Sequence, residues 1–154
     1  RYLIEEKPLG TAGSLTLLPK TIKKPFIVVN GDVLTRFNSS QLINFHNMHN
    51  AAATICVRTH ESTLPFGVVE TNGIELKRFY EKPTYRNLVN AGVYAIDPII
   101  LPLLQRNKRI DMPEFLVSAK EHGNKIIACP IHEYWIDIGR PETLKEAHTS
   151  WNKS

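Results

Sequence analysis

The apolar run from Phe26 to Val29, which stops at Asn30-Gly31-Asp32, constrains the fold more than any other segment of the chain. A continuous apolar run of strand length suits a strand that is buried on both faces. A glycine-rich turn, Leu9-Gly10-Thr11-Ala12-Gly13, precedes the run and opens a short helix. In open α/β sheets, ligands bind at the carboxyl ends of the strands. The layout therefore predicts a nucleotide and metal site where this run ends.

Hydrophobic periodicity predicts that strands and helices alternate along the chain, which implies a mostly parallel sheet with helices on its faces. The Asn72-Gly73 pair indicates a tight turn, so the 66–96 segment adds an antiparallel hairpin. We find no linker and no repeat, so we expect one α/β domain. The expected strands are 26–30, 52–58, 66–70, 74–80, 88–96, 125–129 and 134–138, and the expected helices run from Ser39 or Ser40 to Asn50, from 98 to about 105, from 111 to 122, and from about 140 to 151.

Composition excludes several classes of function. The chain has 154 residues, of which 42% are hydrophobic, and its net charge of +4 is scattered rather than clustered as in nucleic-acid-binding surfaces. No apolar stretch approaches the ~20 residues of a membrane helix, and the first residues do not resemble a signal peptide. Cys56 and Cys129 lie too far apart in sequence for a metal-spaced pair or a disulfide framework. We expect a cytoplasmic protein with reduced cysteines, no nucleic-acid partner and no membrane partner.

The glycine turn has two interpretations. Gly10 and Gly13 lack a Cβ, so the backbone there can approach a base or a phosphate closely, and the helix that begins near Ala12 would present free amides. The alternative is an ordinary tight turn. The spacing matches neither the P-loop nor the dinucleotide-binding fingerprint.

Two isolated acidic residues, Asp32 and Asp137, each follow or interrupt an apolar strand. Either could be structural, since Asp32 could cap a helix. Mg²⁺, however, prefers carboxylate and phosphate oxygens and commonly takes only one or two protein carboxylates. We expect the two side chains to share one Mg²⁺. His46 and His49 lie one helical turn apart, and we expect solvated or half-buried histidines there rather than a metal pair.

Two further motifs suggest a phosphate or sugar ligand. Glu81-Lys82-Pro83 ends a predicted strand; it could form a surface salt bridge, or Lys82 could bind a phosphate while Glu81 accepts hydrogen bonds from hydroxyl groups. Asn90-Ala91-Gly92 lies within an apolar strand, where Asn and Gly weaken pairing unless another group approaches the backbone closely. Trp135 and Trp151 are expected to be core or interface residues.

Six of these elements, in order along nearly the whole chain, resemble the sugar-phosphate nucleotidyltransferases, also called nucleoside-diphosphate-sugar pyrophosphorylases. The Tyr134 to Glu142 segment is especially similar to the bacterial branch with guanylyltransferases that act on mannose or glucosamine 1-phosphate. The matching elements are Leu9-Gly10-Thr11-Ala12-Gly13, Asn30-Gly31-Asp32, Phe66-Gly67-Val68-Val69, Glu81-Lys82-Pro83, Asn90-Ala91-Gly92-Val93-Tyr94 and Trp135-Ile136-Asp137-Ile138-Gly139.

The resemblance implies a Rossmann-like fold and transfer of a nucleotidyl group from a nucleoside triphosphate to a sugar 1-phosphate, with release of pyrophosphate. It implies Mg²⁺ as the cofactor, held by Asp32 and Asp137, with Lys82 on the sugar phosphate, so that these three residues are the expected catalytic ones. Nucleotide binding is expected from Leu9, Gly10, Thr11, Ala12, Gly13 and Gly31, and sugar-phosphate binding from Gly67, Glu81, Lys82, Asn90 and Gly92.

The family's N-terminal signature loop, which wraps the triphosphate, has no counterpart in this sequence. We therefore expect residues 1–154 to be roughly the C-terminal two-thirds of one catalytic domain, inactive alone. We also expect an unpaired strand edge that promotes association between copies, an inference that a clean monomer in light scattering would oppose.

Two alternatives stay open. The first is a glycosyltransferase that uses a nucleotide sugar, although such enzymes normally carry two aspartates one residue apart, whereas Val33 and Leu34 follow Asp32. The second is a non-catalytic relative that binds a sugar phosphate or nucleotide for regulation. The sequence does not identify the base, the sugar or the pathway.

Overall fold

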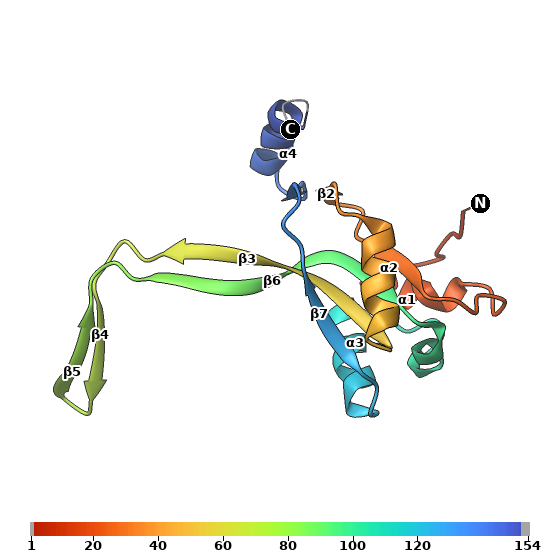
Figure 1. The fold of residues 1–154 in the computed structure, drawn as a ribbon, viewed down its shortest axis with the longest axis horizontal. Coiled ribbons are helices and arrows are strands. Elements are labelled where there is room, and N and C mark those ends of the chain that lie inside the picture. Colours follow the sequence, from red (N-terminus) through yellow and green to blue (C-terminus); the bar gives the residue numbers. More distant parts are fainter. Residues whose placement is uncertain (1, 152–154) are drawn as a thin grey trace.

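The computed structural model describes residues 2–151 as a four-stranded sheet with helices on both faces, from which a two-stranded arm extends (Figure 1). All the expected elements are present, and one strand, β2, was not predicted. The strands are β1 (Phe26–Val29), β2 (Val33–Thr35), β3 (Ala53–Thr63), β4 (Val68–Asn72), β5 (Glu75–Tyr80), β6 (Thr84–Ile96), β7 (Ile126–Pro130) and β8 (Trp135–Asp137). The α-helices are α1 (Gly10–Gly13), α2 (Ser39–Met48), α3 (Met112–Glu121) and α4 (Pro141–Ser150), and the 3-10 helices are η1 (Ser14–Leu17) and η2 (Pro98–Leu103).

The sheet has the strand order β1-β6-β3-β7. Strands β3 and β7 pair in parallel, while β6 pairs antiparallel with both β1 and β3. Three of the four strands therefore run in one direction and β6 runs against them, because the hairpin insertion returns the chain beside β3. This confirms the expected α/β class with an antiparallel insertion.

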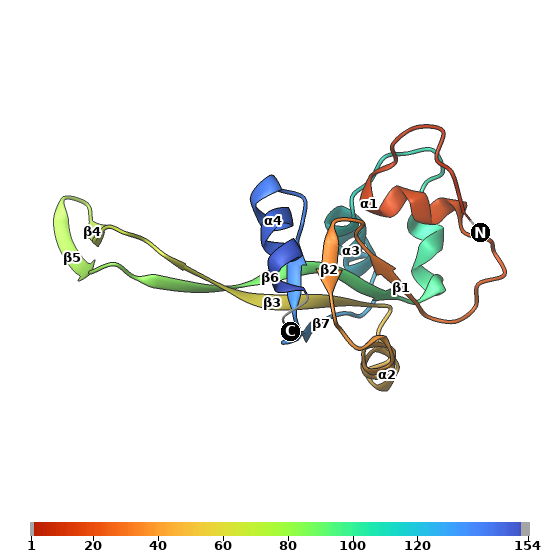
Figure 2. The same ribbon diagram turned by 90° about the horizontal axis from the view of Figure 1, so that it is seen from above.

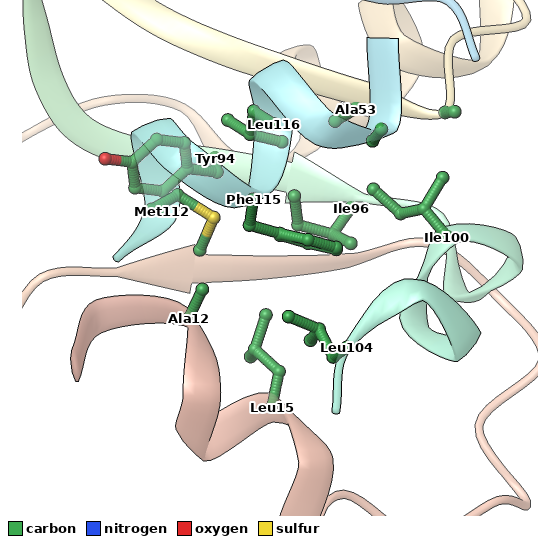
Figure 3. Packing of buried hydrophobic residues seen from close by; sticks show 12 residues of the cluster. Ala12, Leu15, Ala53, Tyr94, Ile96, Ile100, Leu104, Met112, Phe115 and Leu116 are labelled. Carbon is green, nitrogen blue, oxygen red and sulfur yellow. The ribbon is translucent and has the colours of Figure 1, made fainter. Parts of the chain in front are cut away.

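Two hydrophobic clusters cover the two faces of the sheet, and β6 contributes alternately to both. Tyr94 and Ile96 point to one face, and Val93 and Ala95 to the other. Figure 3 shows the first cluster, in which residues of α3, η2 and the N-terminal helices meet the β6 side chains. The second cluster includes Leu42 of α2. The alternation places β6 at the centre of the domain.

Strand β1 is the outer strand of this sheet. Phe26 and Val28 pack against one cluster and Ile27 against the other, so the strand contacts both cores, as expected. It is less buried than expected, because none of the described strands pairs with its outer edge; Val29 is 43% exposed.

Beyond the body, β3 and β6 continue as a two-stranded ribbon, and the β4–β5 hairpin lies at its far end (Figures 1 and 2). Gly73, with φ of +61°, makes the predicted turn. Large apolar side chains are exposed along this arm, namely Leu64, Phe66, Val69, Ile74, Leu76, Phe79, Tyr80, Tyr85 and Leu88.

The two cysteines are free and, although distant in sequence, they occupy paired positions on β3 and β7. Cys56 is buried, and burial raises the pKa of its thiol to about 12. No described helix has the length and apolar character that spanning a bilayer requires.

His46 is almost completely buried at 1% exposure, contrary to the solvated or half-buried side chain that we expected. Its Nδ1 lies 2.9 Å from the Thr54 hydroxyl, and its Nε2 has no hydrogen-bond partner among the described residues. Burial lowers the pKa of His46, because it disfavours the charged imidazolium, and Asp97 acts in the opposite direction.

We predict that His46 makes the fold acid-sensitive. The unfolded chain protonates this histidine below pH about 6.5, while the folded chain keeps it neutral to lower pH, so stability falls as the pH drops through this range. Urea unfolding at pH 7.5 and 5.5 should show a larger loss of stability in the wild type than in His46→Gln. An equal loss in both proteins would contradict the prediction.

Candidate functional site

The amides of the glycine turn are occupied by the chain itself. The Thr11 amide donates to Asp111 Oδ1 (3.0 Å), and the amides of Ala12 and Gly13 donate to the Ile110 carbonyl (3.1 and 3.2 Å). The expectation that this helix presents free amides to a phosphate is therefore wrong. The physical reason is that the 110–111 segment packs directly against the turn.

The same contacts explain why glycine stands at position 10. Gly10 has φ of +78°, and a Cβ there would lie 2.6 Å from the Ile110 carbonyl oxygen and from Asp111 Oδ1. Thr11 in turn accepts a hydrogen bond from the Met112 amide (2.7 Å), which leads the first turn of α3. Asp111 precedes α3 but makes no side-chain cap with its own helix and binds the Thr11 amide, so the starts of α1 and α3 cap each other.

An open groove of about 430 Å³ runs beside the turn, along the end of β1. Thr11 and Ser14 line one part of it, and Asn30 to Asp32 line another. The structure thus brings together the glycine-turn segment and the tip of β1, as predicted. Neither Gly10 nor Gly13 lines the groove.

Asp32 and Asp137 lie side by side because β2 pairs with β8. Val33 is the register partner of Asp137, and the Ile138 amide donates to the Asp32 carbonyl (2.8 Å). Two residues that are distant along the chain are thereby brought to neighbouring positions on one short ladder. Both side chains are exposed at its end.

Gly139 lies between the two carboxylates. A Cβ at this position would be 3.0 Å from Asp137 Oδ1 and 3.4 Å from Asp32 Oδ2, so both oxygens converge on one point. The Gly139 amide also donates to Asp137 Oδ1 (2.8 Å), which orients that carboxylate. The absence of a side chain leaves the space between the acids open.

This arrangement fits a hard cation that is completed by substrate oxygens. Among the described residues no three His, Cys, Asp or Glu side chains form a metal-binding group. Mg²⁺ commonly uses one or two carboxylates together with phosphates and waters. The convergence at Gly139 supplies the two carboxylates and leaves room for the other ligands.

The Asn90-Ala91-Gly92 motif lies beside the same ladder. Gly92, with φ of +67°, accepts a hydrogen bond from the Asn30 amide (2.8 Å), and a Cβ on it would lie 2.8 Å from Val33 Cγ2. Asn90 binds within its own strand: its Oδ1 accepts from the Gly92 amide (3.0 Å), and its Nδ2 donates to the Tyr94 hydroxyl (2.6 Å).

The other motif residues lie at the far end of the ribbon. A Cβ on Gly67 would be 3.2 Å from Glu81 Oε2, so those two residues meet. Lys82 is exposed and has a left-handed φ of +44°, which costs about 1 kcal/mol or more in a non-glycine residue. From Asn90 the ribbon runs six residues to Thr84, about 20 Å at 3.3 Å per residue. The predicted sugar-pocket residues therefore form two separate groups.

Comparison with known proteins identifies the family. The family model described as nucleotidyl transferase matches residues 1–154, the whole chain. The chain belongs to the nucleotidyl transferase family.

Known relatives of this nucleotidyl transferase chain are mannose-1-phosphate guanylyltransferases. It is 32% identical to the mannose-1-phosphate guanyltransferase of Candida albicans over 151 residues, covering 92% of the chain and 41% of the relative. It is 36% identical over 146 residues to the mannose-1-phosphate guanylyltransferase catalytic subunit beta of Danio rerio, covering 90% and 40%. The chain thus spans less than half the length of these relatives.

Solved structures show the same Rossmann-like fold. HddC from Yersinia pseudotuberculosis, complexed with GMP-PN, superposes with a TM-score of 0.69 at 22% identity, covering 97% of this chain and 65% of that one. A UDP-glucose pyrophosphorylase complexed with UDP-glucose superposes with a TM-score of 0.67 at 22% identity, covering 99% and 66%.

Sequence reasoning assigned no role at the candidate site to three residues that lie in it or beside it. Gly139 was quoted in a motif but received no ligand role, Trp135 was expected to be core or interface, and Asp111 was expected only to stand at the start of a helix. The only sequence signal for Gly139 is that a glycine follows Asp137 by two residues. Nothing in the sequence links Asp111 to Thr11.

We predict that the packing at Gly10 makes it far less tolerant of a side chain than Gly73. Both glycines have positive φ, but a Cβ at Gly73 meets nothing within 4 Å. Gly73→Ala should cost about 1 kcal/mol of stability, and Gly10→Ala should cost about 3 kcal/mol because a clash is added. Urea unfolding measures both, and equal losses would show that the contact with Ile110 and Asp111 is unimportant.

Proposed function

We propose that this chain is part of an enzyme that transfers a nucleotidyl group from a nucleoside triphosphate to a sugar 1-phosphate. The observation that carries the proposal is the convergence of the Asp32 and Asp137 carboxylates at Gly139 in a chain of the nucleotidyl transferase family. Coverage of 65–66% of the solved neighbours supports the view that it forms about two-thirds of one catalytic domain.

The chemistry of the reaction suits these residues. A phosphate oxygen of the sugar 1-phosphate attacks the α-phosphorus, a new P–O bond forms, and the bond from the α-phosphorus to the bridging oxygen breaks as pyrophosphate leaves. Positioning and charge neutralisation dominate such a reaction. Bound Mg²⁺ would neutralise phosphate charge. Asp32 and Asp137 would hold it, and the Lys82 ammonium would bind the sugar phosphate.

The relatives support GTP and mannose 1-phosphate as the first substrates to test, because the named relatives are mannose-1-phosphate guanylyltransferases. In the nucleotide site, we assign contacts to the segment Leu9 to Gly13 and to Gly31. Since the turn's amides are already bonded, we infer that the Thr11 and Ser14 side chains of the groove make the polar contacts.

The sugar pocket would use Gly67, Glu81 and Lys82 together with Asn90 and Gly92. These residues lie at opposite ends of the ribbon, so one sugar phosphate can contact both groups only if the arm bends towards β2 and β8.

The proposal places the protein in the cytoplasm, where free thiols such as Cys56 and Cys129 stay reduced. The outer edge of β1 and the exposed arm would favour association between copies, since an unpaired strand edge is a template for pairing.

Pyrophosphate release tests the function. We expect activity from a longer protein that places the triphosphate-binding segment ahead of this chain, highest with GTP and mannose 1-phosphate in a matrix of substrates, and none from residues 1–154 alone. Asp137→Asn should lower the rate of the longer protein about a hundredfold or more, whereas Glu75→Gln, on the exposed β5 strand, should not.

Turnover by the 154-residue chain alone would contradict the assignment of the triphosphate segment to another part of the protein. Binding of a sugar 1-phosphate by the longer protein without any turnover would favour the regulatory alternative. A product formed by glycosyl transfer from a nucleotide sugar would favour the glycosyltransferase.

The cation site predicts a second result, which needs no turnover. Gly139→Ala places a methyl group against both carboxylates and should weaken Mn²⁺ binding about tenfold. Gly31→Ala lies in the loop before Asp32, where a Cβ meets nothing within 4 Å, so it should have little effect. Calorimetric titration compares them, and equal affinities in the two variants would contradict a cation between the acids.

A further inference from the structure

The β2–β8 ladder, which carries both aspartates, is separate from the four-stranded sheet. It consists of only three residue pairs and forms a sheet of its own. A ladder this short does not fix its own position, because isolated two-stranded pairs are marginally stable. Contacts with the rest of the domain must therefore set where Asp32 and Asp137 lie.

A bulge in β6 supplies these contacts. The β3–β6 pairing passes from Ile55/Tyr94 to Val57/Asn90, so residues 91–93 of β6 stand opposite the single residue Cys56. The Asn90 side chain bridges the bulge, with hydrogen bonds to the Gly92 amide and to the Tyr94 hydroxyl. Tyr94 is 1% exposed, so the bulge is tied to the core.

Two successive residues of the bulge, Ala91 and Gly92, contact the two sides of the ladder. Gly92 contacts the β2 side, through the Asn30 amide and the Val33 side chain. Ala91 binds the β8 side, because its carbonyl accepts a hydrogen bond of 2.7 Å from the indole N–H of Trp135. Trp135 also packs against the second hydrophobic cluster.

We propose that Trp135 is a positioning residue for the cation site, acting through its hydrogen bond to Ala91. This inference rests on the proposed function. Trp135 and Asp137 lie two residues apart on one strand, so their side chains share a face. The indole group is a donor only and needs an acceptor in a defined direction. Its bond to Ala91 therefore fixes the position and orientation of β8 near Asp137 relative to the β6 bulge. The same bulge contacts Asn30 and Val33, which flank Asp32 on the β2 side.

The same bulge would link the cation site to the sugar pocket, since Gly92 is an expected sugar-pocket residue and also bonds to Asn30 in the loop before Asp32. A shift of β8 would alter the distance between the two carboxylates. Trp135 would therefore affect the cation site without contacting a substrate itself. Trp135 is half-buried.

The test is a titration of Mn²⁺ binding. The electron paramagnetic resonance signal of free Mn²⁺ reports the bound fraction, so the test does not depend on turnover. Trp135→Phe keeps an aromatic ring but removes the N–H, and we expect about tenfold weaker binding, as for other groups that orient metal ligands. The matched control is Trp151→Phe, whose ring lies against Arg36 and Tyr134; its affinity should stay within about twofold of the wild type.

A second variant separates the hydrogen bond from ring packing. Benzothienylalanine at position 135 replaces the N–H by sulfur while keeping the size of the bicyclic ring, and we expect it to weaken Mn²⁺ binding as Trp135→Phe does. In the active longer protein, both changes should raise the KM for Mg²⁺ more than the KM for the sugar 1-phosphate.

The outcomes distinguish the two proposals. The proposed function would be overturned if the wild type bound no Mn²⁺, or if Asp32→Asn and Asp137→Asn bound Mn²⁺ as tightly as the wild type does. Wild-type binding through both aspartates, with normal binding by the benzothienylalanine variant, would overturn the positioning role alone. Equal weakening by Trp151→Phe would also overturn it, because the effect would then be a general loosening of the fold.

Discussion

The bulge of β6 at Ala91 and Gly92 is the constraint on which the candidate site depends. It is held to the core through Asn90 and Tyr94, and it bonds to the loop before β2 and to β8. Asp32 and Asp137 are more than a hundred residues apart in the sequence. The contacts of the bulge with both sides of the β2–β8 ladder hold their carboxylates close together. Bulges beside active sites commonly re-aim side chains in this way.

The glycine turn shows how one motif can be structural and still define a site. Its amides bond to the 110–111 segment, and the starts of α1 and α3 satisfy each other. This arrangement uses the donors that a phosphate would need, so in the proposed function charge neutralisation would fall to side chains and to the bound cation. The turn then contributes a rigid wall to the groove at β1 rather than an anion-binding nest.

The fold and the pairing of the aspartates could be predicted from sequence because they depend on patterns that extend along most of the chain. Apolar runs gave seven of the eight strands, and the order of motifs gave the family. Strand β2 was missed, because Val33-Leu34-Thr35 is too short to show a period, although its pairing with β8 is what joins Asp32 to Asp137.

Contacts between distant segments were the part that the sequence could not supply. The free amides at Gly10 to Gly13 were an error of this kind, since the sequence does not reveal that Ile110 and Asp111 lie against them. The separation of Gly67 and Glu81 from Asn90 and Gly92 was hidden for a similar reason: motif order says nothing about how far a two-stranded ribbon extends from the body.

The central claim is that Asp32 and Asp137 share one divalent cation in the space left by Gly139. Anomalous X-ray scattering from crystals soaked in Mn²⁺ tests it most directly, because it locates the metal without any assumption about activity. The account predicts one peak within bonding distance of a carboxylate oxygen from each aspartate. A peak bound elsewhere, with both carboxylates lacking a metal, would contradict it.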